Sequence, residues 1–359
     1  MSELSKERAL MITIDGSFGE GGGQILRYSA LFAAALGKPV RVFNIRANRP
    51  NPGLRAQHLS TLKIMLNLFK GTAEGLHIGS KEVTLKLEGP KGGKIEYDIG
   101  TAGSISLVLQ TLIPATLLAD SPSEIVLKGG TDVKWSPTID YMSYVYKSIV
   151  EMVGGNVEIN VIKRGYYPAG GGIVRVHVDP VSKIRPIRLI KRGAIQEVKV
   201  ISTVSQLPAH ILERQIEGAL DELRMINLSK ELIKTVTHYY SRTNSAGPGT
   251  SVLVTALHTG NVYSGGDAIG EKGVRAEEVG REASKKFIKW YTSNAVFDVF
   301  AGDMIIPYAV LSYENCTFSV PEITEHIKSA LFVAKKFIDT LSYEIEEGDG
   351  RYKVISISF

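Results

Sequence analysis

The segment from Asp15 to Arg27 combines glycine, an acid and an arginine in a pattern suited to holding phosphate. It reads Asp-Gly-Ser-Phe-Gly-Glu-Gly-Gly-Gly-Gln-Ile-Leu-Arg and contains five glycines. Glycine lets backbone N–H groups approach an oxyanion, and a helix that begins after such a loop adds the positive end of its dipole. Glu20 is then available for a metal ion and Arg27 for phosphate charge. A tight turn between a strand and a helix is the alternative.

A second cluster, residues 44–58, is rich in arginine and stiffened by proline. Its basic and stiffening residues are Arg46, Arg49, Pro50, Pro52 and Arg55. A guanidinium group grips phosphate through a planar fork of donors, and proline limits how far the loop can rearrange. Gln57 and His58 follow at the predicted start of a helix, where an anion is again favoured. A solvated basic loop is the alternative.

His326 lies where a helix is predicted to begin. If Thr324 is the N-cap, His326 falls in the first helical turn, whose positive end disfavours an imidazolium. A neutral imidazole keeps a free lone pair and can act as a nucleophile near pH 7. A surface or packed histidine is the alternative. No two of the seven histidines are spaced as metal ligands on a helix, so we expect no histidine metal site.

Two further patterns allow either chemistry or plain structure. Asp298 and Asp303 flank a predicted loop near the C-terminus, where either could bind ribose hydroxyls or a metal and either could cap a helix. The run 164–172 ends in three consecutive glycines between predicted strands, which would let a backbone or a ligand come close. A hairpin turn is the simpler interpretation of that run.

The composition is that of an ordinary globular protein. The chain has 359 residues, 44% of them apolar, and its net charge of +5 permits an anionic partner without requiring one. A single cysteine, Cys316, excludes an internal disulfide and a thiolate zinc site. The charged N-terminus lacks a signal core, and the most apolar stretch, 107–119, is too short to cross a bilayer. We therefore expect a soluble, cytoplasmic protein.

One pattern of elements recurs along the chain: a glycine-bearing loop, a helix, a strand, a second helix and two strands. The copies are expected at about residues 11–99, 100–178 and 302–359. The last two strands of the first copy are predicted at 83–87 and 94–98, paired with each other. Helices packed on one face of each sheet give an α+β architecture.

The residues between the second and third copies break this pattern, and we interpret them as a small inserted α/β domain. The predicted division assigns residues 1–184 and 277–359 to the three-repeat domain and residues 185–276 to the insert. The clearest elements of the insert are predicted strands at 198–203 and 251–257.

Four of these strings, in order, resemble the RNA 3′-terminal phosphate cyclase family. They are residues 15–27, 49–58, 129–132 (Gly-Gly-Thr-Asp) and 167–172 (Tyr-Pro-Ala-Gly-Gly-Gly). The resemblance covers nearly the whole chain and implies three repeats of two helices on a four-stranded sheet with a smaller insert. It also implies that ATP converts an RNA 3′-phosphate end into a 2′,3′-cyclic phosphate, releasing AMP and pyrophosphate, with a divalent metal, Mg²⁺ or Mn²⁺.

The resemblance also implies roles for single residues. His326 matches the family's nucleotidylated histidine, which implies a histidine–AMP intermediate and then RNA(3′)pp(5′)A, and Glu20 matches the acid that meets the metal. Positions that match nucleotide-binding or phosphate-binding residues are Arg27, Arg46, Arg49, Gln57, His58, Gln110, Phe300 and Asp303. At Phe300 many relatives carry tyrosine, and beside Asp303 many carry glutamine where this chain has Met304, which leaves the nucleotide preference open.

Two other functions compete with the cyclase. One is a non-catalytic relative that binds RNA in ribosome assembly and lacks the nucleophilic histidine; the joint presence of His326, Arg46 and Glu20 argues against it. The other is an RNA-binding module without nucleotide use, against which the modest net charge argues. The expected partners are ATP and an RNA with a 3′-phosphate end, with no membrane partner. The sequence leaves open the oligomeric state and the cellular RNAs.

Overall fold

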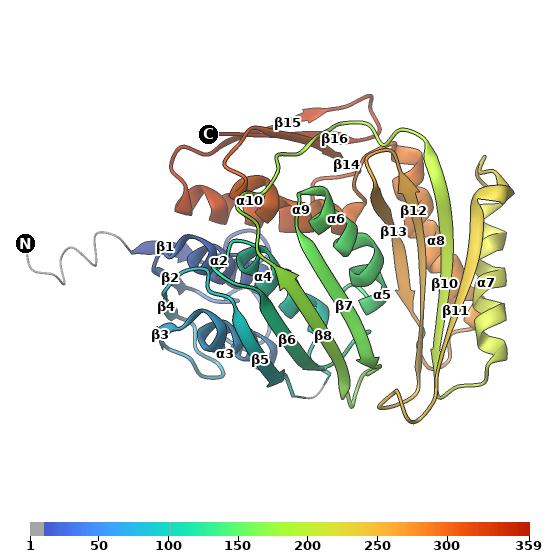
Figure 1. The fold of residues 1–359 in the computed structure, drawn as a ribbon, viewed down its shortest axis with the longest axis horizontal. Helices are drawn as coiled ribbons and strands as arrows, with labels where there is room; N and C mark the ends of the chain where they lie inside the picture. The colour runs from blue at the N-terminus through green and yellow to red at the C-terminus, as the bar shows by residue number, and fades with distance from the viewer. Residues whose placement is uncertain (1–10, 101) are drawn as a thin grey trace, which may run out of the picture.

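The computed structural model describes residues 11–100 and 102–359, which form four four-stranded sheets with helices packed on them (Figure 1). Three of these sheets share one topology. In each, the first strand of the unit runs parallel to the second, and the other two strands extend the sheet through antiparallel pairings. The predicted α+β fold of three repeats, each of two helical segments on a four-stranded sheet, is confirmed.

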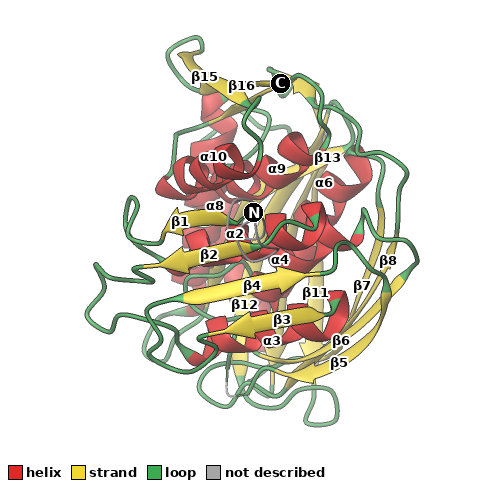
Figure 2. Ribbon diagram, turned by 90° about the vertical axis from the view of Figure 1, so that its left-hand side faces the viewer, coloured by secondary structure: helices red, strands yellow, loops and turns green. Residues whose placement is uncertain are grey.

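The first unit contains the glycine loop. Its elements are β1 (Ile12–Asp15), α2 (Gly23–Leu36), β2 (Val40–Phe43), α3 (Ala56–Phe69), β3 (Gly71–Glu74) and β4 (Val83–Leu87). The sheet order is β1-β2-β4-β3, and Figure 2 shows these strands on the outside with α2 and α3 behind them. Residues 16–22 connect β1 to α2, so the glycine loop leads directly into a buried helix.

The second unit repeats this order with a broken second helix. Its elements are β5 (Gly93–Asp98), α4 (Ile105–Thr116), β6 (Ser123–Gly129), α5 (Ile139–Tyr141), the π-helical turn η1 (Met142–Tyr146), α6 (Lys147–Met152), β7 (Asn156–Lys163) and β8 (Gly172–Asp179). The predicted pairing of 83–87 with 94–98 is wrong, because β5 lies parallel to β6 and begins the second sheet. Alternating polarity identifies a strand without saying which sheet it joins.

The third unit is interrupted by the insert. Its elements are β9 (Arg188–Leu189), α9 (Val299–Leu311), β14 (Cys316–Val320), α10 (Glu325–Phe337), β15 (Ser342–Glu347) and β16 (Lys353–Ser358). Strand β9 pairs in parallel with β14, so the insert separates the first strand of this unit from its first helix. A two-residue strand carries no periodicity, which is why the sequence did not predict it.

The insert has its own sheet, in the order β11-β10-β12-β13. Its elements are β10 (Ile195–Ser205), α7 (His210–Leu223), the 3₁₀ turn η2 (Lys230–Leu232), β11 (Ile233–Tyr240), β12 (Gly249–His258), β13 (Val262–Ile269) and α8 (Ala276–Ser293). Helix α8 packs against α7 and the sheet around the buried Trp290. The division into two domains stays a prediction, but these contacts group α8 with the insert, whereas the predicted boundary placed residues 277–293 outside it.

The helices of the three repeated units meet in the centre of the molecule. Helix α2 contacts α4, α9 and α10, and one continuous apolar core joins these units (Figure 1). These contacts place the first turn of α2 near the first turn of α10. Within the described ranges, no helix combines the length and apolar character that a membrane crossing requires.

Candidate active site

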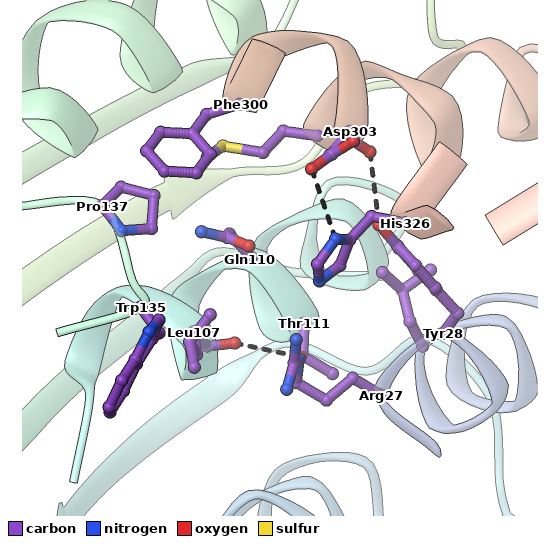
Figure 3. Close-up of a pocket in the computed structure, with 12 residues that line it drawn as sticks. Arg27, Tyr28, Leu107, Gln110, Thr111, Trp135, Pro137, Phe300, Asp303 and His326 are labelled. Carbon is purple, nitrogen blue, oxygen red and sulfur yellow. Dashed lines mark hydrogen bonds and ion pairs between the residues drawn. The ribbon is translucent and has the colours of Figure 1, made fainter. Parts of the chain in front are cut away.

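A pocket opens where α2, α4, α9 and α10 meet (Figure 3). It spans about 570 Å³ of space, part of which is open to solvent. Its polar and aromatic lining residues are Arg27, Tyr28, Gln110, Thr111, Trp135, Phe300, Asp303 and His326. Five predicted site residues from four helices distant in sequence therefore share one cavity: Arg27, Gln110, Phe300, Asp303 and His326.

His326 occupies the first turn of α10. Thr324 is the N-cap, as predicted, and its hydroxyl accepts a hydrogen bond from the Ile327 N–H at 3.0 Å. Burial, followed by the positive charge of Arg27, lowers the pKa of His326 below its ordinary value of 6.5. The shift has the direction expected for a neutral imidazole at a helix N-terminus, so the ring keeps a lone pair near pH 7.

Asp303 stands beside the imidazole. Its Oδ2 lies 3.8 Å from Nδ1 of His326, and its Oδ1 accepts a hydrogen bond from the Thr324 hydroxyl. Burial raises the pKa of Asp303 to about 7, and the nearby Asp298 adds to the shift. Because Nδ1 is the ring nitrogen nearest the carboxyl group, Nε2 is left for another partner.

Arg27 brings an unpaired positive charge to the pocket. No ion pair or hydrogen bond joins its guanidinium group to any residue in the described part of the chain, and burial lowers its pKa. A desolvated guanidinium without a carboxylate partner gains most from an anionic ligand. The charge, the cavity and the uncharged histidine therefore favour a phosphate-bearing ligand here.

The glycine loop is held against the start of α10. The ring of Phe18 stacks on Phe332 of that helix with centroids 4.0 Å apart. Gly19 has φ 60°, and a Cβ at that position would lie 3.1 Å from Oε2 of Glu325. The N-cap of α2 is Gly22, which offers no side-chain cap, so the first N–H groups of α2 are free to bind an anion.

The arginine-rich connection between β2 and α3, residues 44–55 (the arginine loop), lies across the glycine loop, residues 16–22. Asn48 Nδ2 donates to the Ser17 carbonyl at 3.1 Å, and Nη2 of Arg49 pairs with Oε2 of Glu20 at 2.8 Å. Glu20 and Arg49 both act electrostatically on His326, which places this pair beside the pocket. Among the residues that the structure describes, Arg46 donates only to the Asn51 carbonyl, at 3.3 Å, and so keeps capacity for a further acceptor.

Gln57 and His58 do not line the pocket, and both serve the fold. The Gln57 amide donates to the Ser104 carbonyl at 3.1 Å and accepts from the Ser104 N–H at 2.7 Å. His58 Nδ1 accepts from the Arg55 N–H at 3.2 Å, and burial with nearby arginines lowers its pKa to about 3. A Cβ at Gly23 would lie 2.1 Å from His58 Nε2, so the ring packs against the first turn of α2.

Two patterns that the sequence left open are structural. Asp298 caps α9, accepting from the N–H groups of Phe300 and Ala301, and also accepts from the Tyr141 hydroxyl at 2.7 Å. The run 164–172 forms the β7–β8 hairpin. At its start Arg164 is buried and bonded to Asp132 and Asp140, with Nη2 of Arg164 2.5 Å from Oδ1 of Asp140. These groups support the site without lining it.

The described side chains do not form a complete set of metal ligands. Among residues 11–100 and 102–359, no cluster of three or more histidine, cysteine or acidic side chains is arranged to hold an ion. Glu20 is the one acid on the glycine loop, and its side chain is 53% exposed. Such a single carboxylate suits Mg²⁺ that completes its shell with substrate phosphates and water.

Sequence reasoning missed two aromatic lining residues, Tyr28 and Trp135. The Tyr28 hydroxyl donates to the Asp303 carbonyl at 3.3 Å and joins α2 to α9. Trp135 stands on a turn with 93% of its surface exposed. An isolated tyrosine or tryptophan in a sequence gives no signal of such placement, because both types are more often packed in the core.

Comparisons with known proteins point to one family. A family model described as RNA 3′-terminal phosphate cyclase matches residues 18–342. A protein of that name from Pyrococcus furiosus is 44% identical over 340 residues, covering 95% of this chain and 96% of its own. Namesakes from Methanopyrus kandleri and Hyperthermus butylicus are 39% and 42% identical, covering 97% and 94% of this chain and 98% and 94% of their own.

Proposed function

The chain belongs to the RNA 3′-terminal phosphate cyclase family, and on that premise we propose that it uses ATP to convert an RNA 3′-phosphate end into a 2′,3′-cyclic phosphate. The matching relatives are named as cyclases, so the chain is a cyclase, and this enzyme family uses ATP as co-substrate. The finer proposal is that the reaction passes through a covalent histidine–AMP intermediate and then RNA(3′)pp(5′)A.

One observation carries this proposal: the pocket that holds His326 also holds an unpaired guanidinium group. The lone pair of His326 supplies a nucleophile, since its pKa is lowered. Arg27 supplies charge for the phosphates, and the N–H groups at the start of α2, which no side chain caps, supply further donors. A scaffold protein would need neither a neutral histidine nor a half-buried, unpaired cation, so these features favour catalysis over the assembly role.

In the first step, Nε2 of His326 attacks the α-phosphorus of ATP. The new P–N bond forms as the bond to pyrophosphate breaks, and pyrophosphate leaves. The Asp303 carboxyl group, whose Oδ2 lies 3.8 Å from Nδ1 of His326, orients the imidazole ring. Arg27 offsets the negative charge that builds on the phosphates. Phe300 and Gln110 would contact the nucleoside part of ATP from the same pocket.

In the later steps, the RNA provides both nucleophiles. An oxygen of the 3′-phosphate attacks the adenylate phosphorus, the P–N bond breaks, and the neutral histidine is restored. The adjacent 2′-hydroxyl then attacks the activated 3′-phosphorus, loses its proton, and expels AMP. This last step is intramolecular, so a high effective concentration drives it and it asks little of the protein.

In this proposal, some residues around the pocket act on phosphate charge or hold the metal ion, and others hold the helices in place. Arg46 and Arg49 would neutralise charge where two polyanions meet. Glu20 would hold Mg²⁺ or Mn²⁺, which when bound draws charge from the phosphates. Gln57 and His58 would act indirectly, by holding the starts of α4 and α2, since their side chains are engaged in the bonds described above.

The test is labelling with ATP carrying a labelled α-phosphate, followed by a denaturing gel. We expect an acid-labile labelled band, and we expect His326→Ala to lose both the band and cyclisation while keeping its fold, because the side chain is 46% exposed. His326→Asn serves as a second variant of similar polarity. Normal cyclisation by either variant would remove histidine from the covalent step. RNA binding without any label in the unsubstituted protein would favour the non-catalytic relative.

A further inference from the structure

Trp135 is placed unlike any other tryptophan or phenylalanine of the described chain. Its ring is 93% exposed, yet it lines the same pocket as His326 (Figure 3). Its backbone has φ 60°, the left-handed region that bulky residues rarely occupy. Backbone outliers of this kind concentrate at ligand-binding positions.

The turn that carries Trp135 is clamped by the insert. Lys134 Nζ pairs with Oε2 of Glu271 at 2.7 Å. On the other side, the Thr138 N–H donates to Oδ2 of Asp267 at 2.7 Å, and Asp267 is buried on β13. Within the turn, the Ser136 hydroxyl donates to the Val133 carbonyl at 2.9 Å. The insert therefore fixes the position of the ring relative to the pocket, although it contributes no lining residue.

We propose that Trp135 is a stacking platform for the base of the terminal nucleotide of the RNA. This inference rests on the proposed function, because it places the RNA end within reach of His326. Aromatic side chains bind unpaired bases by stacking, which tolerates any base identity. A platform of this kind suits an enzyme that acts on the end of a chain and not on one sequence.

The geometry favours RNA over the adenine of ATP as the occupant. Phe300 and Pro137 both line the pocket, and the Phe300 ring packs edge-on against the buried Tyr141, with ring centroids 5.8 Å apart. Pro137 is buried and Phe300 is half-buried, so these two side chains can receive a small molecule. The ring of Trp135 is almost fully exposed, so a macromolecular ligand can reach it.

The binding test uses RNA oligonucleotides with a 3′-phosphate whose last nucleotide carries a base or is abasic. We expect Trp135→Ala to weaken binding of the normal oligonucleotide roughly 5- to 100-fold, and Trp135→Phe to restore most of it. Removal of the terminal base should weaken binding to the unsubstituted protein by a similar factor and have little effect in Trp135→Ala. Labelling by ATP in the absence of RNA should change much less than RNA affinity in the two variants.

The two tryptophans allow a direct spectroscopic check. Trp290 is fully buried, so acrylamide should quench only the emission of Trp135. RNA with a 3′-phosphate should shield Trp135 from acrylamide, whereas a non-hydrolysable ATP analogue should not. Shielding by the analogue alone, unchanged RNA affinity in Trp135→Ala, or a parallel loss of ATP labelling would each overturn the proposal.

The outcomes also separate this inference from the proposed function. Terminal-base binding that depends on Trp135, in a protein that takes no label from ATP, would support the platform and contradict the histidine–AMP route. Labelling and cyclisation that proceed equally well with Trp135→Ala at limiting RNA would support the route and contradict the platform. A protein that binds no RNA at all would contradict both.

Discussion

Oδ2 of Asp303 lies 3.8 Å from Nδ1 of His326, and Thr324 organises both residues. The Thr324 hydroxyl donates to the Asp303 carboxyl group and accepts from the Ile327 N–H that begins α10. The acid of one helix and the base of the next are thus positioned by one side chain. A change in the protonation of Asp303 or His326 therefore affects the orientation of the other side chain.

The first prediction concerns the pKa of His326. Burial and the charge of Arg27 lower this pKa, so Arg27→Gln should raise it by removing a nearby cation. The measurement is a titration of the His326 ring by NMR in the absence of nucleotide. Arg41→Gln is the control, because Arg41 pairs with Glu82 on the surface and should leave His326 unchanged. An identical titration in Arg27→Gln would show that burial alone sets the pKa.

The second prediction concerns the pH dependence of stability. The pKa of Asp303 is raised from 3.8 to about 7 in the folded protein, so folding favours its protonated form. Its contribution to stability is therefore fully present below pH 3.8 and is lost as the pH rises through about 7. Asp303→Asn has no such loss. Relative to the unsubstituted protein, the variant should gain free energy of unfolding over this range, at most on the order of 4 kcal/mol.

Denaturant unfolding of the two proteins at pH 4 and pH 8 measures this difference. Asp298, whose pKa is raised to about 6, is present in both proteins, so the difference reports Asp303 together with its electrostatic interaction with Asp298. A difference that stays constant with pH would show that Asp303 is ionised in the fold throughout the range.

Local signals made some elements predictable. The sequence predicts a helix directly after the glycine loop, and α2 begins there, with glycine on both sides of an apolar run. The N-cap at Thr324 is predicted from the residue types around His326 and is present. By contrast, Ser136 and Pro137 have the residue types of an N-cap and a first helical position, yet Thr138 is the cap and accepts from the Tyr141 N–H.

Long-range pairing could not be predicted in the same way. The membership of β5 in the second sheet and of β9 in the third depends on partners far along the chain. The same holds for the site. Gln57 looked like a ligand-binding residue beside the arginines, yet its amide is used by Ser104, which lies 47 residues away. The sequence gives the type of each residue but does not show which distant residue forms hydrogen bonds with it.

The third prediction concerns the Arg49–Glu20 pair. Its side chains are 39% and 53% exposed, and an exposed pair contributes at most about 1 kcal/mol to stability. Arg49→Ala should therefore keep the melting temperature while slowing ATP labelling and cyclisation. Glu20→Gln should raise the concentration of Mg²⁺ needed for half-maximal labelling, since it removes the one acid of the glycine loop.

Arg41→Ala is a matched control for both variants. It breaks the Arg41–Glu82 pair, whose side chains are 42% and 49% exposed, on the strand that leads into the arginine loop. Activity should be unaffected by this change. If Arg49→Ala and Arg41→Ala reduced activity equally, or if Arg49→Ala unfolded the protein, the role of Arg49 would be structural.

The fourth prediction concerns the strained backbone at Trp135. Asparagine adopts φ near 60° more readily than tryptophan, and the exposed ring makes little packing contact to lose. Trp135→Asn should therefore melt at the same temperature as the unsubstituted protein or higher. Trp135→Val should melt lower, because a β-branched residue fits this region poorly, at a cost of roughly 1–2 kcal/mol.

Thermal unfolding of the three proteins, compared with their affinity for RNA, decides what the ring is for. A more stable Trp135→Asn that binds RNA weakly would mean that tryptophan is kept at this turn for its ligand, at the expense of the fold. A clear loss of stability in Trp135→Asn would instead show that the indole packs against the turn clamped by Glu271 and Asp267. In that case its exposure to solvent would be incidental to binding.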